Sequence, residues 1–212
     1  MGHGTARGIS EAFRGVPAEG VPGCASRLVR AARARGANGA SAPWPGRILD
    51  LYEHQWQGQA LREDEFVLST DEKTSIQARL RLHATLPPLP GSPMKVEHEY
   101  ERKGAWAYLA AWDVHRAKLF GRCETQSGIA PFDRLVAQVM NQEPYRSARR
   151  VFWIMDNGSS HRGDRSVRRL QDRYPAVQVV HGSVHASWLN QIEIYFSLIP
   201  RKLLTPNDFP PL

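Results

Sequence analysis

The 212-residue sequence contains little cysteine and no long apolar run. Its two cysteines, Cys24 and Cys123, lie far apart and form no C-x-x-C pair, which argues against a disulfide framework and against a structural zinc site. No apolar stretch approaches the roughly 18 residues that a membrane span needs. The first residues also lack the apolar centre of a secretory signal. These absences predict a cytoplasmic protein with free thiols.

Acidic residues are fewer than basic ones, and the difference is greatest near the N-terminus. The chain has 28 Lys and Arg against 21 Asp and Glu, a formal charge of +7. Up to Arg47, seven arginines stand against only Glu11 and Glu19. Residues 1–45 are rich in Gly, Ala, Ser and Pro and offer too little apolar surface to offset their ordering entropy, so we expect a disordered basic arm. Such an arm either binds nucleic acid through phosphates or is an ordinary solvated tail.

The remaining residues, 46–212, predict one mixed α/β domain. Hydrophobic periodicity predicts helices from Pro45 to about Gly58 and over 132–140, 165–174 and 188–203. Strands are predicted at 66–69, 76–80, 106–112, 118–122, 151–155 and 177–180. A bend or bulge is predicted at 70–74, a turn at 113–116 and a proline-rich loop at 86–93. The first strands indicate an antiparallel meander, and the wholly apolar run Val151–Met155 indicates a central strand buried on both faces.

Three acidic residues stand in separate predicted elements. Asp71 lies where the first strand breaks, Asp156 follows the buried strand, and Glu193 lies in the last helix. Ligands bind beyond the carboxyl ends of strands in open α/β sheets, so the first two can converge. Carboxylate oxygens suit Mg²⁺ or Mn²⁺. Each acid alone is more often a turn or surface residue, and only their joint order favours a two-metal site.

The predicted helix around Glu193 has two distinct faces. The apolar face consists of Leu189, Ile192, Phe196, Ile199 and Leu203. The polar face consists of Asn190, Glu193, Ser197 and Arg201. Glu193 can therefore point into a polar cleft while its helix packs against the sheet.

Three strings of residues resemble a known family. They are STDEKTSIQ from Ser69, WIMDNGSSH from Trp153 and HASWLNQIE from His185, and the third contains the specific pattern H-x-S-W-L-N-x-x-E. From about Ile48 to Phe209 the chain resembles bacterial insertion-sequence transposases of the mariner-related DDE superfamily. The 36 residues between the second and third acids also fit that family.

The resemblance implies an RNase H-like mixed sheet flanked by helices, together with metal-dependent cleavage and strand transfer of DNA. It makes Asp71, Asp156 and Glu193 the catalytic residues and the ligands of two Mg²⁺ or Mn²⁺ ions. One ion activates the attacking water or 3′ hydroxyl, and the other stabilises the leaving 3′ oxygen. It also implies double-stranded transposon ends and target DNA as partners, a homodimer when active, and a nucleoid-associated location in a bacterium.

Other residues of these strings carry weaker expectations. His161 and His185 either contact phosphate or are structural, and neither is expected to bind metal. Trp188 is expected to anchor the last helix, and Asn190 to orient the carboxylate of Glu193. Several basic residues either line a DNA path or are ordinary surface charges: Lys73, Arg162, Arg165, Arg168, Arg169, Arg201 and Lys202.

The sequence departs from the family pattern at both ends. The family carries helix-turn-helix domains ahead of the catalytic core, and none is recognisable before Pro45, while the chain stops at Leu212; we therefore expect a truncated transposase core. Pro200 predicts a kink or an end in the last helix. Two alternatives stay open: an RNase H-like nuclease that cuts without strand transfer, and an inactive DNA-binding remnant.

Overall fold

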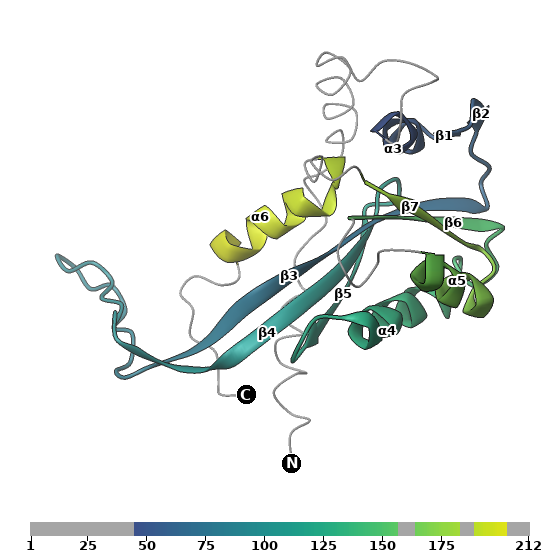
Figure 1. The fold of residues 1–212 in the computed structure, drawn as a ribbon. Coiled ribbons are helices and arrows are strands. Elements are labelled where there is room, and N and C mark those ends of the chain that lie inside the picture. Colours follow the sequence, from purple (N-terminus) through teal and green to yellow (C-terminus); the bar gives the residue numbers. More distant parts are fainter. Residues whose placement is uncertain (1–44, 157–163, 183–188, 203–212) are drawn as a thin grey trace.

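The computed structural model describes residues 45–156, 164–182 and 189–202 (Figure 1). Its helices are α3 (Pro45–Tyr52), α4 (Ile129–Met140), α5 (Asp164–Arg173) and α6 (Ile192–Lys202). Its strands are β1 (Gln55–Trp56), β2 (Gln59–Ala60), β3 (Glu65–Arg81), β4 (Tyr100–Asp113), β5 (Lys118–Glu124), β6 (Arg150–Met155) and β7 (Val177–His181). Within these ranges no helix has both the length and the apolar character needed to cross a membrane. The expected basic arm, up to residue 44, lies outside them.

The main sheet has five strands in the order β5-β4-β3-β6-β7. Strands β3, β4 and β5 form an antiparallel meander, and β6 and β7 continue the sheet parallel to β3. Helices separate the later strands along the chain, as the predicted order of elements requires. The observed sheet therefore confirms the RNase H-like mixed architecture.

Helices cover both faces of this sheet (Figure 1). Helix α4 packs with the Leu68, Leu109 and Trp153 side of the sheet, and Leu170 of α5 joins the same cluster. Helices α3 and α6 lie over the opposite face, where α3 contacts Val67, Phe152 and Ile154, and α6 contacts Trp106, Tyr108 and Ala110. Because successive side chains of a strand point to opposite faces, the apolar residues of β3, β4 and β6 divide between the two layers.

Strand β3 runs without interruption through the residues predicted to form a bend. Its pairing with β4 continues from Leu68 through Lys73, and the first register shift lies between Lys73 and Ile76, where Ser75 has a φ of 59°. The predicted irregularity between the two strand segments therefore occurs, but it lies between Lys73 and Ile76 and not from residue 70 onward. The pairing with β4 supplies the backbone hydrogen bonds that keep this polar segment extended, so Asp71 lies within a strand.

The first described helix is shorter than predicted. Helix α3 ends at Tyr52 and is followed by the β1–β2 hairpin, which the sequence did not predict. His54, Gln57 and Gly58 have φ values of 60°, 51° and 77°, which are incompatible with a continuing right-handed helix. Trp56 still packs on the core, 4.8 Å from the Phe152 ring between centroids.

The last helix begins later than predicted, at Ile192 instead of Trp188, and continues through Pro200 to Lys202. Of the predicted apolar face, Leu189, Ile192 and Phe196 are buried. Asn190 is buried as well and precedes α6, so it does not form part of a polar face of that helix.

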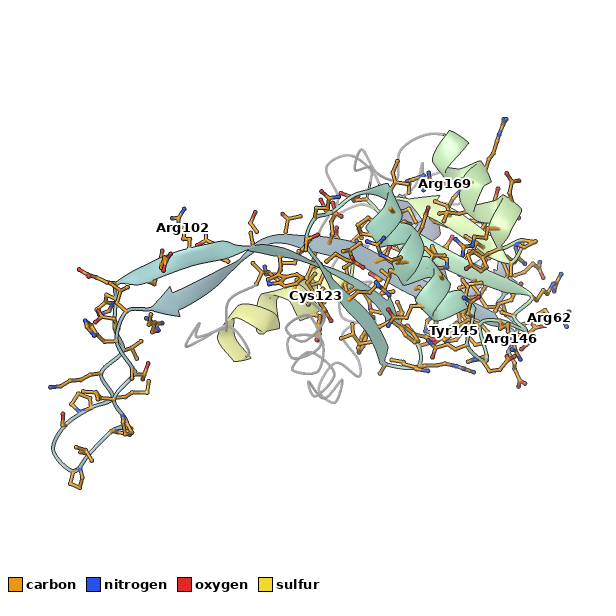
Figure 2. All side chains as sticks on the ribbon, turned by 90° about the horizontal axis from the view of Figure 1, so that it is seen from below. Arg62, Arg102, Cys123, Tyr145, Arg146 and Arg169 are labelled. Atoms are coloured by element: carbon orange, nitrogen blue, oxygen red, sulfur yellow. The ribbon has the colours of Figure 1, made fainter. Side chains whose placement is uncertain are left out.

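Beyond the main sheet, β3 and β4 continue as a two-stranded ribbon, because β6 pairs with β3 only over residues 65–69 and β5 pairs with β4 only over 107–113. The ribbon projects away from the helices, and Arg102 lies on it (Figure 2). Four exposed apolar side chains lie at its far end: Leu82, Leu86, Leu89 and Met94. The predicted proline-rich loop falls within this end.

Candidate active site

Asp71 and Asp156 lie on neighbouring strands and on the same face of the sheet. The parallel register pairs Ser69 of β3 with Ile154 of β6, and each acid lies two residues beyond its member of that pair. Side chains two residues apart share a face of a strand, so both carboxyl groups belong to the layer that α3 and α6 cover. The hydroxyl of Thr70 donates to the Ile154 carbonyl oxygen at 3.1 Å and holds the two strands together at this point. Asp71 is half-buried and Asp156 is exposed.

Glu193 reaches the same place from α6. It lies in the first turn of that helix and is exposed. The helix packs on the sheet through Ile192, Tyr195 and Phe196, which are 0, 5 and 3% exposed. The Glu193 carboxyl is therefore on the unburied side of α6, where it is near enough to Asp71 to influence the pKa of that carboxyl.

The pKa of Asp71 responds to both Asp156 and Glu193. Burial, more than any other influence, raises the pKa of the Asp71 carboxyl from 3.8 to about 7. The negative charges of Asp156 and Glu193 raise it further, as does the hydrogen bond to Glu193, while the Glu72 backbone N–H lowers it. Like charges raise a carboxyl pKa only when they are near, so residues from β3, β6 and α6 share one negative site.

A fourth acid near these residues, Glu72, was not singled out from the sequence. Burial raises the pKa of this carboxyl, and the charge of Asp156 raises it further. Its Oε2 atom is buried and accepts no hydrogen bond within the described part of the chain. Glu72 pairs with Leu109 and so points to the face opposite Asp71. The sequence does place Glu72 directly beside Asp71. Because neighbouring residues of a strand point to opposite faces, that adjacency alone does not predict that both acids influence one site.

The donor atoms fit a hard divalent cation, although the protein alone does not form a complete cage. No group of three or more His, Cys, Asp or Glu side chains in the described ranges is arranged to enclose a metal ion. Mg²⁺ typically takes one or two carboxylates and completes its octahedron with water and substrate phosphate. The raised pKa of Asp71 means that a cation would also relieve the repulsion among these acids.

The other residues singled out in the sequence have varied surroundings. Lys73 lies on the same strand face as Asp71 and is half-buried. Arg168 is exposed, and Arg169 forms an ion pair with Asp133 at 3.2 Å. The Asn190 side-chain amide hydrogen bonds to Ser69 and Thr70 of β3 and not to the Glu193 carboxyl. The side chains that lie outside the described residues are those of His161, Arg162, Arg165, His185, Trp188, Arg201 and Lys202.

Comparisons with solved structures give partial similarities. The Mos1 mariner paired-end complex with Mn matches at 18% identity and a TM-score of 0.42, over 62% of this chain and 40% of that one. The Mos1 transposase paired-end complex with the left transposon end matches at 16% identity and a TM-score of 0.44, over 65% of this chain and 41% of that one. The intasome of simian T-cell lymphotropic virus matches at 7% identity and a TM-score of 0.42, over 70% of this chain and 44% of that one. The chain thus spans about two fifths of the length of each of these proteins.

A comparison with curated proteins gave no match. The family model of the DDE superfamily endonucleases, in contrast, matches residues 67–210. The match covers well over half of the chain and includes all five strands of the main sheet from Val67 onward, as well as Asp71, Asp156 and Glu193. The chain therefore belongs to the DDE superfamily endonucleases.

Proposed function

We propose that this chain is the catalytic core of a DDE transposase, a metal-dependent enzyme that cuts DNA and transfers the cut strand. Asp71, Asp156 and Glu193 are the proposed catalytic residues and the ligands of two Mg²⁺ or Mn²⁺ ions. The observation that carries the proposal is the placement of Asp71 and Asp156 on one face of the sheet, with Glu193 on the helix that covers that face. The pKa of Asp71 is raised to about 7, first by burial and then by the charges of Asp156 and Glu193. Family membership supports the same reaction class.

Bound divalent ions would activate the attacking oxygen and stabilise the leaving 3′ oxygen at phosphorus. The protein contributes the placement of the three carboxyl groups. The β3–β6 register sets the spacing of Asp71 and Asp156, and the packing of α6 sets the position of Glu193. Asp71 must lose its proton before it can serve as a ligand, and its raised pKa puts that step near neutral pH.

We propose double-stranded transposon ends and target DNA as substrates, and a homodimer as the active form, because joining two ends requires them to be held together. The predicted basic arm would add nonspecific phosphate contacts, and binding that depends on it would weaken steeply as salt rises. Magnesium as the physiological ion, an insertion-sequence origin and a nucleoid-associated, cytoplasmic location belong to the same proposal.

The test combines two assays on one set of variants. Nicking of supercoiled plasmid in Mn²⁺ measures cleavage, and joining of a pre-cut 3′-hydroxyl oligonucleotide to plasmid DNA measures strand transfer. Asp71→Asn, Asp156→Asn and Glu193→Gln should each abolish both activities. Asp172→Asn is the matched control, because Asp172 is an exposed acid on α5.

The outcomes separate the alternatives. Metal-dependent nicking with no joined product would favour an RNase H-like nuclease without strand transfer. DNA binding with no metal-dependent cleavage in the wild type would favour an inactive DNA-binding remnant. Cleavage that survives in all three acid variants would refute the proposed catalytic residues.

A further inference from the structure

The backbone just before α6 is held by a tyrosine from a distant helix. Tyr52, the last residue of α3, donates its hydroxyl proton to the Leu189 carbonyl oxygen at 2.7 Å. The same hydroxyl accepts the Gln191 backbone N–H at 3.4 Å. Tyr52 therefore joins two points of the segment that leads into Glu193, although 137 residues separate it from Leu189 in sequence.

A serine of β3 holds the other end of this segment. The Ser69 hydroxyl accepts the Ile192 backbone N–H at 3.0 Å and donates to the Asn190 side-chain oxygen. The Asn190 side-chain nitrogen donates in turn to the Thr70 carbonyl oxygen at 2.8 Å. We refer to Tyr52, Ser69 and Asn190 together as the hydroxyl–amide network.

The network is buried. Tyr52, Ser69 and Asn190 are 5, 0 and 6% exposed, so water has little access to replace any one of them. Each of the two hydroxyls donates one hydrogen bond and accepts another, and these two bonds together fix its orientation. Loss of one hydroxyl leaves a buried backbone group without its partner, at a cost of about 1–3 kcal/mol.

The geometry links this network directly to the proposed catalytic acids. Ser69 and Asp71 are two residues apart in β3 and therefore share a face of the strand. Glu193 follows Ile192, the residue whose N–H Ser69 accepts, and its own N–H donates to the Asn190 carbonyl oxygen at 3.1 Å. The same contacts that bind the start of α6 to β3 thus set the separation of Glu193 and Asp71.

We propose that Tyr52, Ser69 and Asn190 are positioning residues that hold Glu193 beside Asp71 and so determine the affinity of the site for divalent cations. The inference rests on the proposed function of Asp71, Asp156 and Glu193 as ligands. It also gives α3 a role in the site, although this helix precedes the region, residues 67–210, that the family model matches.

The test measures Mn²⁺ binding by calorimetry and by electron paramagnetic resonance in the full chain. Tyr52→Phe and Ser69→Ala each delete one hydroxyl and leave all three acids in place. We expect each to raise the Mn²⁺ dissociation constant about tenfold, the lower end of the effect of residues that orient ligands indirectly. We also expect saturating Mn²⁺ to restore plasmid nicking, because only the position of a ligand is lost.

Tyr145→Phe is the matched control. Tyr145 is also a fully buried tyrosine, and its hydroxyl donates to Asp113 at 2.7 Å on the α4 side of the sheet. This variant should lose a similar amount of thermal stability and keep the Mn²⁺ affinity of the wild type. Ser69→Ala serves as the second probe if Tyr52→Phe does not fold.

The results separate this inference from the proposed function. Unchanged Mn²⁺ affinity in both hydroxyl variants overturns the inference, as does a loss of affinity that merely follows thermal stability across all three variants. If the wild-type protein shows no Mn²⁺ binding, or if Asp71→Asn does not remove the binding it shows, the proposed function and this inference are both overturned.

Discussion

Neutralising Asp71 should stabilise the metal-free protein at neutral and alkaline pH. Its pKa is raised from 3.8 to about 7, so the folded chain binds this proton more tightly than the unfolded chain does. The stability that the folded state gains from this tighter proton binding is fully present below about pH 4 and is lost as the pH rises toward 7. Above pH 7 the folded state holds an ionised Asp71 that is partly removed from water and lies near two like charges, and Asp71→Asn removes both costs.

The size of the effect follows from the shift. A change from 3.8 to about 7, at 1.36 kcal/mol per pH unit, corresponds to roughly 4 kcal/mol. Asp71 is only half-buried and solvent screens part of the repulsion, so we expect about 2 kcal/mol. This gain in stability would accompany complete loss of cleavage.

Urea denaturation in EDTA, followed by tryptophan fluorescence, measures the difference between Asp71→Asn and the wild type. The variant should be more stable at pH 8, and its advantage should shrink by about pH 5, because the wild-type carboxyl is then protonated. The control Asp172→Asn should show neither effect. An Asp71→Asn protein that is no more stable than the wild type at pH 8, or whose advantage does not depend on pH, would refute the raised pKa of Asp71.

Three further predictions follow from described contacts. Mn²⁺ should raise the melting temperature of the wild type but not of Asp71→Asn, as measured by differential scanning fluorimetry. Gly121→Ala should destabilise the fold by about 1–3 kcal/mol in urea titrations, because the added Cβ would collide with the Tyr108 ring. Burial and then the charge of His54 lower the pKa of His115 from 6.5, so His115 should reduce stability as the pH falls below about 6.5. The stability difference between His115→Asn and the wild type should therefore change between about pH 7 and pH 5, and a difference that stays constant would contradict this assignment.

Much of the fold was predictable because strong local patterns agree with the tertiary structure. The apolar run Val151–Met155 lies in β6, and all five of its residues are buried as those of a central strand should be. The periodic residues from Phe132 to Met140 became α4, with all the predicted apolar positions buried. In both segments the pattern of burial is set by one element packing on its immediate neighbours.

The missed features depend on contacts between distant residues. The start of α6 at Ile192 follows from the Ser69 hydroxyl, 123 residues away, which accepts the Ile192 N–H. The β1–β2 hairpin contains His54 and Gln57 with positive φ values, which residue types other than glycine rarely adopt and sequence rarely signals. Local propensity holds no information about either feature.

The candidate site divides in the same way. The order and chemical type of Asp71, Asp156 and Glu193 were readable from the sequence. Their common face depends on the β3–β6 register, which pairs Ser69 with Ile154, and a slip of one residue would turn Asp156 away from Asp71. Two features became visible only in the folded chain. The charge of Asp156 raises the pKa of Glu72, and the Asn190 side chain hydrogen bonds to β3.

The burial of α3 decides where a working fragment of this protein can begin. Ile48, Leu49 and Leu51 are at most 1% exposed and cover Val67, Phe152 and Ile154. A fragment cut to start at residue 67 would expose that apolar layer of the sheet and would also lack Tyr52. Expression boundaries for biochemistry should therefore lie before Pro45, and a shorter product would tend to aggregate through the uncovered sheet face.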